Sequence, residues 1–311
     1  DGLLNVNGIF EERFDVILTN PPFGARIDKG QKISEADQFT DQELIDQYLR
    51  KYGDAYEKAL KQVNDNIGKP LLKIFDVGEM SGLTEVLFME RCLRLLKKGG
   101  RMGMVLPEGV LNTSNLQKVR EYFEGRAKIL LICSIPQDVF TAAGATVKPS
   151  LVFLKRFTQE EEITYANVTK KARKEVRETY QNEIARLDEE LRMQNENLEQ
   201  NPDNKKQTRR KIKEIRIRLA AIEDAIIEKA KPLIKKYFDY EIPMAMVEDA
   251  GITATGAVSS NNQLKPLQEE YKTYRIRNQL WQEKRGSIIY TIKEDGRIYR
   301  IAEGREEELN W

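Results

Sequence analysis

Residues 14–24 read FDVILTNPPFG, a short apolar run that ends in two prolines. An apolar run of this length predicts a buried parallel strand. Pro21 and Pro22 lack the N–H group that a central strand needs, so the strand must end there and pass into a stiff loop. The sequence therefore predicts an α/β protein in which Asn20 and Phe23 lie in a rigid loop at the end of a strand.

Strand and helix patterns alternate after this loop. Apolar residues at helical spacing predict a helix over 84–98, which ends in KKGG at 97–100 as a C-cap. Residues 24–80 are polar with weak helical periodicity over 41–63, and we expect a long loop there. Further elements are predicted as strands at 102–106, 128–135 and 150–157 and as a helix at 116–123. Two strands without a helix between them indicate a mainly parallel sheet with an antiparallel hairpin.

Residues 170–237 are charged and almost free of glycine, with one interruption at 201–204. Apolar residues form one stripe in each half, namely Val176, Tyr180, Ile184, Leu187, Leu191 and Leu198, then Ile212, Ile215, Leu219, Ile222 and Ile226. This pattern predicts a long antiparallel helical hairpin. Arms of about 30 residues would reach about 45 Å, which suits a contact with another subunit. The last 70 residues are expected to hold a loop over 251–262, a short helix and a hairpin over 287–301.

Composition narrows the possible chemistry. The chain has no histidine and two cysteines, which removes the commonest general base and metal ligand, so we expect no metal site. Cys92 and Cys133 lie in apolar patterns and are interpreted as buried thiols in a reducing compartment. Without a membrane-length apolar stretch or a signal pattern, the protein is expected to be cytoplasmic, with no membrane partner.

Charge is nearly balanced, with 51 Lys and Arg against 50 Asp and Glu. Any contact with nucleic acid must therefore be local or shared with a partner. The basic runs 170–174 and 205–211 are candidates for phosphate contacts. A solvated face balanced by nearby glutamates is favoured for the first run, whereas both interpretations stand equally for the second.

The tetrapeptide Asn20-Pro21-Pro22-Phe23 suits one particular reaction. The exocyclic amine of adenine is a poor nucleophile because its lone pair is conjugated into the ring. The side-chain oxygen of Asn20 and the carbonyl of Pro21 could accept hydrogen bonds from its two N–H groups, and the prolines would hold both acceptors in place. Phe23 could stack on a base turned out of the duplex. The alternative interpretation is a plain turn after a strand, with Phe23 buried.

An ordered series of blocks extends this motif. They are FDVILTNPPFG at 14–24, LFM at 87–89 followed by KGGR at 98–101, VLPEGVL at 105–111, IPQDVF at 135–140, KPSLVFLK at 148–155 and AGITATG at 250–256. Together they resemble the catalytic half of the modification subunits of type I restriction-modification systems, which are N6-adenine DNA methyltransferases. The resemblance covers residues 1–157 and, more weakly, 240–265.

The resemblance implies a Rossmann-like methyltransferase sheet, seen here in part, together with the helical hairpin. It implies S-adenosyl-L-methionine as methyl donor, a flipped adenine as acceptor, and DNA, a separate specificity subunit and a restriction subunit as partners in a bacterial or archaeal cell. The implied catalytic residues are Asn20, Pro21, Pro22 and Phe23; the cofactor-binding residues are Asp1, Gly2 and Asn20; and the residues at the target base or DNA are Phe23, Phe140 and Lys148. For Phe140, packing between strands is an equally good interpretation. The expected domains are 1–165 (catalytic), 166–239 (hairpin for subunit contact) and 240–311.

One part of the family pattern is missing from the sequence. The glycine-rich loop that holds the methionine part of the cofactor is expected upstream of Asp1, and GGRMG at 99–103 has the wrong order of elements for it. We therefore expect the 311 residues alone to be inactive. Two alternatives stay open: an N-methyltransferase for RNA or a protein glutamine, and an assembly module without activity.

Overall fold

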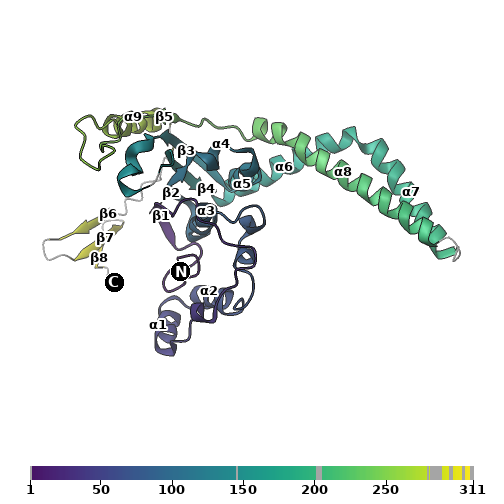
Figure 1. The fold of residues 1–311 in the computed structure, drawn as a ribbon, viewed down its shortest axis with the longest axis horizontal. Helices are drawn as coiled ribbons and strands as arrows, with labels where there is room; N and C mark the ends of the chain where they lie inside the picture. Colours follow the sequence, from purple (N-terminus) through teal and green to yellow (C-terminus); the bar gives the residue numbers. More distant parts are fainter. Residues whose placement is uncertain are drawn as a thin grey trace. The chain divides into compact units, whose positions relative to one another are not determined.

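The computed structural model describes residues 2–144, 146–200, 205–278, 280, 289–293, 297–302 and 305–308. The chain divides into two compact units (Figure 1). The first comprises Asp1–Gln137 and Thr146–Met246, and the second comprises Asp138–Ala145 and Val247–Trp311. Each unit is described by itself below.

The first unit is built on a five-stranded sheet of order β1-β2-β4-β3-β5. Its strands are β1 (Phe14–Thr19), β2 (Leu96–Pro107), β3 (Ala127–Ser134), β4 (Pro149–Arg156) and β5 (Met244–Met246). Strand β4 runs antiparallel to both of its neighbours, while β1 pairs with β2 and β5 with β3 in parallel. Four strands thus point one way, and the predicted α/β class with a mainly parallel sheet is confirmed.

Strand β1 lies at one edge of this sheet. Val16 and Leu18 are 52% and 76% exposed, whereas Ile17, on the opposite face, packs against the core. The strand is parallel as predicted, but the prediction that it is buried was wrong. Side chains alternate between the faces of a strand, and only the Ile17 face is covered by the core in the described part of the chain.

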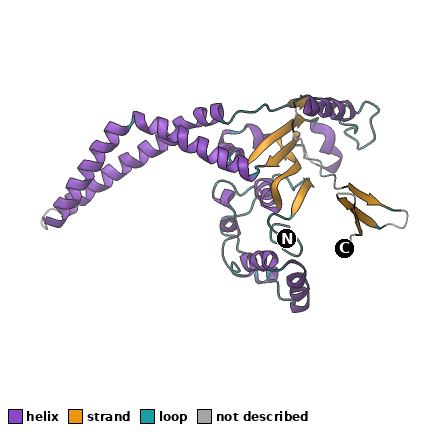
Figure 2. Cartoon of the chain, turned by 180° about the vertical axis from the view of Figure 1, so that it is seen from behind, coloured by secondary structure: helices purple, strands orange, loops and turns teal. Residues whose placement is uncertain are grey.

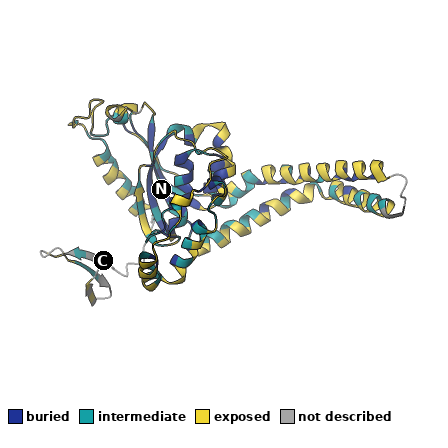
Figure 3. Cartoon of the chain, turned by 60° about the horizontal axis from the view of Figure 1, so that its bottom comes forward, coloured by how far each residue is buried: buried dark blue, intermediate teal, exposed yellow. Residues whose placement is uncertain are grey.

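Helix α3 (Thr84–Leu95) is buried on nearly every side and packs against the sheet (Figure 3). It ends earlier than expected, because Leu96 is already extended and begins β2. Residues 97–100 therefore do not cap the helix. The pairing of β1 with β2 jumps from Phe14–Leu96 to Val16–Arg101, so these residues form an irregular bulge. Gly99 supplies its left-handed φ of +76°.

Residues 24–80 contain more structure than a loop. They form the helices α1 (Gln42–Tyr52) and α2 (Asp54–Asn64) and three short 3-10 turns, η1 (Glu35–Asp37), η2 (Leu71–Ile74) and η3 (Asp76–Glu79). Each helix buries only a narrow stripe. Ile45 and Tyr56 pack with Val6 and Phe10 from the start of the chain, forming a small second core. The expectation of a long loop was wrong, because the weak helical periodicity over 41–63 corresponds to two helices whose apolar residues pack in this second core.

Short elements complete the main core. Helices α4 (Glu108–Asn112) and α5 (Gln117–Glu124) and the 3-10 turns η4 (Ser114–Leu116) and η5 (Gln137–Ala143) connect β2, β3 and β4. The predicted helix over 116–123 and the predicted strands over 128–135 and 150–157 are confirmed within one or two residues at each end. Helix α5 buries Val119, Tyr122 and Phe123 in the core.

The helical hairpin is confirmed (Figure 2). Its outgoing arm is α6 (Gln159–Thr179) and α7 (Gln181–Gln200), separated by a break at Tyr180, and its returning arm is α8 (Lys205–Tyr237). The predicted interruption at 201–204 lies outside the described residues. The expected stripes pack together, and Leu187, Ile215 and Ile226 are among their most buried members. The hairpin begins at Gln159, because Thr158 caps α6 with Glu161 in a capping box.

The second unit holds α9 (Leu264–Arg277) and a small antiparallel sheet of β6 (Ile289–Ile292), β7 (Ile298–Ala302) and β8 (Arg305–Glu308). The hairpin expected over 287–301 is found as the pairing of β6 with β7. In the described ranges no helix has the length and apolar character to cross a membrane. Those same ranges hold no cluster of His, Cys, Asp or Glu able to ligate a metal ion.

Candidate active site

The loop after β1 presents polar and aromatic groups at the carboxyl edge of the sheet. Asn20 is exposed, Pro21 is buried, and Phe23 is partly buried. Gly24 follows with a φ of +72°, a left-handed conformation that glycine adopts without steric cost. Phe23 is thus neither a core residue nor a free surface ring, and the interpretation of a plain turn over a buried phenylalanine fits it poorly.

Two buried residues at the start of α3 hold this loop. The Thr84 hydroxyl is within hydrogen-bonding distance of the Pro22 carbonyl at 3.0 Å and of the Ala25 carbonyl at 3.2 Å. The Thr84 N–H also donates to the Ala25 carbonyl at 3.0 Å. The Gly24 N–H donates to Oε2 of Glu85 at 3.2 Å. The loop is therefore fixed on both sides of Phe23.

Glu85 is a buried carboxylate, only 3% exposed. Its charge lies in the first turn of α3, where the helix dipole and unpaired N–H groups stabilise a negative group. Sequence reasoning missed both Thr84 and Glu85. The only available signal was an acidic residue in a first helical turn, which is equally common on exposed helices.

The acceptors proposed for catalysis are not engaged. Within the described part of the chain, neither the Asn20 side chain nor the Pro21 carbonyl forms a hydrogen bond, whereas the Pro22 carbonyl is held by Thr84. The loop thus has bound carbonyls at Pro22 and Ala25 and, at Asn20 and Pro21, acceptors that no described residue engages. Such acceptors on a fixed backbone match the preorganised groups that stabilise a reacting centre.

Two other residues predicted from the sequence, Gly2 and Lys148, can be placed relative to this loop. Gly2 lies beside the Phe88 ring: a Cβ atom at this position would be 3.4 Å from it. Phe88 is one helical turn after Thr84, so Gly2 lies toward the N-terminal end of α3. Pro149 pairs with Pro107, which places Lys148 at the carboxyl edge of the sheet, with its Nζ 3.9 Å from Oε2 of Glu108.

The structure does not place the other two predicted positions relative to this loop. Phe140 lies in η5 and belongs to the second unit. Asp1, the predicted contact to the cofactor adenine, lies outside the described residues.

A buried polar network supports α3 from its other side. Glu90 is fully buried and accepts hydrogen bonds from the N–H groups of Asp76 at 3.0 Å and Val77 at 2.8 Å. It also pairs with Arg94. Burial, with the nearby Glu90 charge, raises the pKa of the Tyr122 hydroxyl, which stays protonated and donates to Asp76 at 3.0 Å. These bonds fix η3 against the helix that carries Thr84 and Glu85.

Replacing Thr84 with valine should loosen the loop without removing any proposed acceptor. The hydroxyl would be lost while the side-chain volume stays similar, so we expect turnover to fall about 10- to 100-fold and stability to fall by about 1–2 kcal/mol. Turnover in the native protein and urea unfolding would measure these effects. Thr84→Ser should recover most of the activity. Thr164→Val, which removes a hydroxyl bonded to the Glu160 carbonyl on α6, is the matched control. Wild-type turnover in Thr84→Val would show that the loop needs no such support.

The sequence profile of the N-6 DNA Methylase family matches residues 52–220. This range is more than half of the 311 residues. The chain belongs to the N-6 DNA methylase family. The matched range runs from the end of α1 into α8 and includes Thr84 and Glu85, while the loop at Asn20 precedes it. No match is found among the curated proteins.

Several solved protein structures are similar to part of this N-6 DNA methylase. A protein of Listeria monocytogenes assigned to the class I S-adenosylmethionine-dependent methyltransferases is 20% identical over 51% of this chain and 36% of its own, with a TM-score of 0.31. A type I restriction enzyme modification subunit from Vibrio vulnificus is 21% identical over 50% of this chain and 26% of its own, with a TM-score of 0.32. The EcoKI M protein is 18% identical over 49% and 22%, with a TM-score of 0.30. The chain thus spans between 22% and 36% of these proteins, and the family match carries the assignment.

Proposed function

We propose that this chain is the catalytic part of a DNA adenine-N6 methyltransferase and acts as the modification subunit of a type I restriction-modification system. The observation that carries the proposal is the loop after β1. It combines the unengaged acceptors of Asn20 and Pro21 with a backbone held by Thr84 and Glu85. Family membership supports an adenine amine as the methyl acceptor.

The chemistry follows from the loop groups. The Asn20 side-chain oxygen and the Pro21 carbonyl accept hydrogen bonds from the two N–H groups of the target amine. These bonds would draw the nitrogen toward a pyramidal geometry and free its lone pair from the ring. Transfer of the methyl group would then form the N–C bond as the bond from carbon to the sulfur of S-adenosyl-L-methionine breaks, and the nitrogen would lose one proton to solvent. Because the acceptors are fixed before the substrate arrives, they cost little reorganisation during the reaction. The partly buried Phe23 ring offers a stacking surface for the extruded base.

The residues present fit one end of S-adenosyl-L-methionine, which would supply the electrophilic methyl group. Gly2 presents a backbone without a Cβ near Phe88, and Asn20 presents an exposed amide; both lie toward the N-terminal end of α3. We assign these two residues to cofactor binding. Lys148, on the same edge of the sheet, is assigned to the DNA backbone near the target base, and Phe140 to the aromatic residue beside that base.

A substrate comparison tests the proposal against its two alternatives. The native protein, purified with its associated subunits, would be given methyl-labelled S-adenosyl-L-methionine with duplex DNA, single-stranded RNA or a glutamine-containing protein extract. The proposal expects label in the DNA alone. Labelled RNA or protein, with none in DNA, would replace it with the corresponding N-methyltransferase. Absence of label in all three would favour an assembly module.

The helical hairpin is the proposed contact to the separate specificity subunit. Joining Tyr180 to Ala220 through a short Gly-Ser linker removes α7 and the facing part of α8. It leaves Val176, Ile222 and Ile226 to bury one another. The base of the hairpin also keeps its aromatic cluster of Phe157, Tyr165, Phe238 and Tyr240.

This shortened hairpin should reduce recovery of the partner subunit at least about 10-fold in co-purification without DNA. The sheet should stay folded, because the main core lies outside the deletion. Circular dichroism and thermal unfolding would check the fold. Unchanged recovery of the partner would exclude the outer part of the hairpin as the subunit contact.

A further inference from the structure

The first part of α8, residues 205–218, has a high density of positively charged side chains. Residues 205–218 contain eight Lys and Arg side chains and a single carboxylate, Glu214. All eight cations are exposed. The whole chain carries a net charge of only +1, so the electrostatic field of this segment is local and not part of a general basic surface.

Ion pairs with neighbouring carboxylates do not neutralise this segment. Within the described residues, Arg210 pairs with Glu214 at 3.1 Å, and the other seven cations have no ion pair. Farther along the same helix the pattern differs. Lys231 pairs with Glu121 and Glu228 at 2.8 and 2.6 Å, and Lys235 with Glu124 at 3.6 Å. Direct ion pairs therefore balance the far end of α8 but few of the cations in its first part, although the facing helix α7 carries carboxylates of its own.

Four of these cations form a continuous row, which we call the basic stripe: Lys206, Arg209, Lys213 and Arg216. Steps of three and four residues place them on one face of the helix. Ile215 packs into the apolar core of the hairpin. Ile212 is also buried and lies beside the row, where it lines the same groove as Arg209. At 1.5 Å per residue the stripe is about 15 Å long. One DNA strand places a phosphate every 3.4 Å of helix axis, so the stripe could face about four of them.

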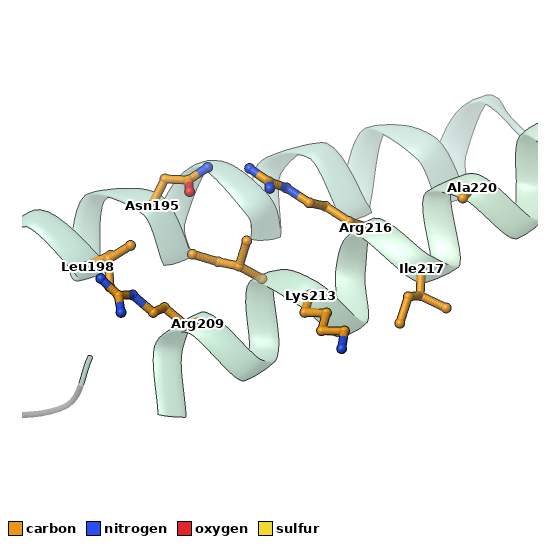
Figure 4. Close-up of a pocket in the computed structure, with 8 residues that line it drawn as sticks. Asn195, Leu198, Arg209, Lys213, Arg216, Ile217 and Ala220 are labelled. Atoms are coloured by element: carbon orange, nitrogen blue, oxygen red, sulfur yellow. The ribbon is translucent and has the colours of Figure 1, made fainter. Parts of the chain in front are cut away.

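A groove runs beside the stripe. It has a volume of about 440 Å³, and its polar lining residues are Arg209, Lys213 and Arg216 from α8 and Asn195 from α7. The other half of its lining is apolar: Leu198, Ile212, Ile217 and Ala220. Figure 4 shows the Arg216 guanidinium and the Asn195 amide extending toward each other from the two helices. Guanidinium and amide groups both donate hydrogen bonds to phosphate oxygens. The groove therefore offers directed donors in addition to charge.

We propose that the basic stripe binds the phosphate backbone of duplex DNA away from the catalytic loop, without reading its sequence. This inference rests on the proposed function, which supplies DNA as the substrate. The stripe would raise the affinity for DNA of any sequence and leave the chemistry at Asn20 unchanged. Its effect would appear in KM for DNA, while kcat at saturating DNA stays the same.

The test replaces all four stripe residues with glutamine, as Lys206→Gln, Arg209→Gln, Lys213→Gln and Arg216→Gln. Glutamine keeps a high helix propensity, so α8 should persist, and circular dichroism would verify it. The matched control removes four exposed lysines from other elements, as Lys58→Gln, Lys73→Gln, Lys118→Gln and Lys236→Gln. Both variants would be prepared as the native protein with its subunits, and titrated with a 30-base-pair duplex at several salt concentrations.

The stripe variant should bind the duplex at least about 10-fold more weakly than wild type, and the control should bind like wild type. The slope of log affinity against log salt is negative, and each lost phosphate contact makes it about 0.9 less steep. Loss of four contacts would therefore make it up to about 3.6 less steep. Unchanged affinity and slope in the stripe variant would overturn the inference. So would loss of the associated subunits from that variant, because the stripe would then be a contact to an acidic protein surface.

The two proposals fail separately. If wild type methylates no DNA but binds the duplex through the stripe, the proposed function fails and the phosphate contact stands. If wild type methylates DNA and the stripe variant has unchanged KM and affinity, the phosphate contact fails and the proposed function stands.

Discussion

Replacing Asn20 with alanine is expected to abolish methyl transfer and leave the fold intact. The variant loses the side-chain acceptor that pyramidalises the target amine. Removal of one preorganised hydrogen-bonding group typically lowers turnover about 100- to 1,000-fold. Asn20 is exposed and its side chain forms no hydrogen bond with another described residue, so the free energy of unfolding should change by less than about 0.5 kcal/mol. Single-turnover methylation of DNA by the native protein would measure the loss.

The same substitution at an unrelated exposed asparagine provides the control. Asn197→Ala lies on α7, far along the chain from the loop, and should have wild-type turnover. Binding of S-adenosyl-L-methionine and of DNA to Asn20→Ala should be measured alongside, to separate a chemical defect from a binding defect. Near wild-type turnover in Asn20→Ala would remove this residue from the mechanism.

Glu90→Ala is expected to have the largest effect on stability. The Glu90 side chain is completely buried and holds two backbone N–H groups of η3 as well as Arg94. Its removal leaves the two backbone N–H groups without their acceptor inside the protein, while Arg94 keeps its pairs with Glu11 and Asp76. Breaking a buried ion pair on one side typically costs about 3–5 kcal/mol. Urea unfolding followed by circular dichroism would measure the change in the free energy of unfolding.

An exposed ion pair gives the comparison for this variant. Glu57→Ala breaks the pair with Lys61 on α2, at 2.7 Å, where both side chains face solvent. Its midpoint of urea unfolding should move little, because exposed pairs contribute little to stability. A Glu90→Ala variant as stable as Glu57→Ala would mean that the buried network does not hold η3 and α3 together.

The parts of the fold that local patterns encode were predicted well. The hairpin stripes of Val176 and Leu187 in one arm and of Ile215 and Ile222 in the other are visible in short windows, and the structure packs them as expected. Helices α1 and α2 were missed. Each buries few residues, and their partner Phe10 lies more than 30 positions earlier in the sequence. Both helices are amphipathic and coincide with the weak periodicity over 41–63, but no local window shows the distant residues that cover their apolar faces.

The candidate site was predicted only in part, because some of its contacts are local in sequence and others join distant residues. The loop at Asn20 follows from a strand that ends in prolines, which are neighbours in sequence. Its attachment to Thr84 and Glu85 depends on hydrogen bonds across about 60 residues, which no local pattern encodes. At residues 97–100 a local pattern gave a wrong prediction, because a long-range pairing decides the structure there. Their glycines suggested a helix cap, but the pairing with β1 placed them in a bulge of β2.

The position of the transferred methyl group tests the account most directly. Duplex DNA would be incubated with the native protein and methyl-labelled S-adenosyl-L-methionine, digested to nucleosides and separated by mass. The account predicts label in N6-methyl-2′-deoxyadenosine from the DNA, formed about 100- to 1,000-fold more slowly by the Asn20→Ala variant. Label on cytosine or on a ring nitrogen, or equal labelling by wild type and Asn20→Ala, would contradict it.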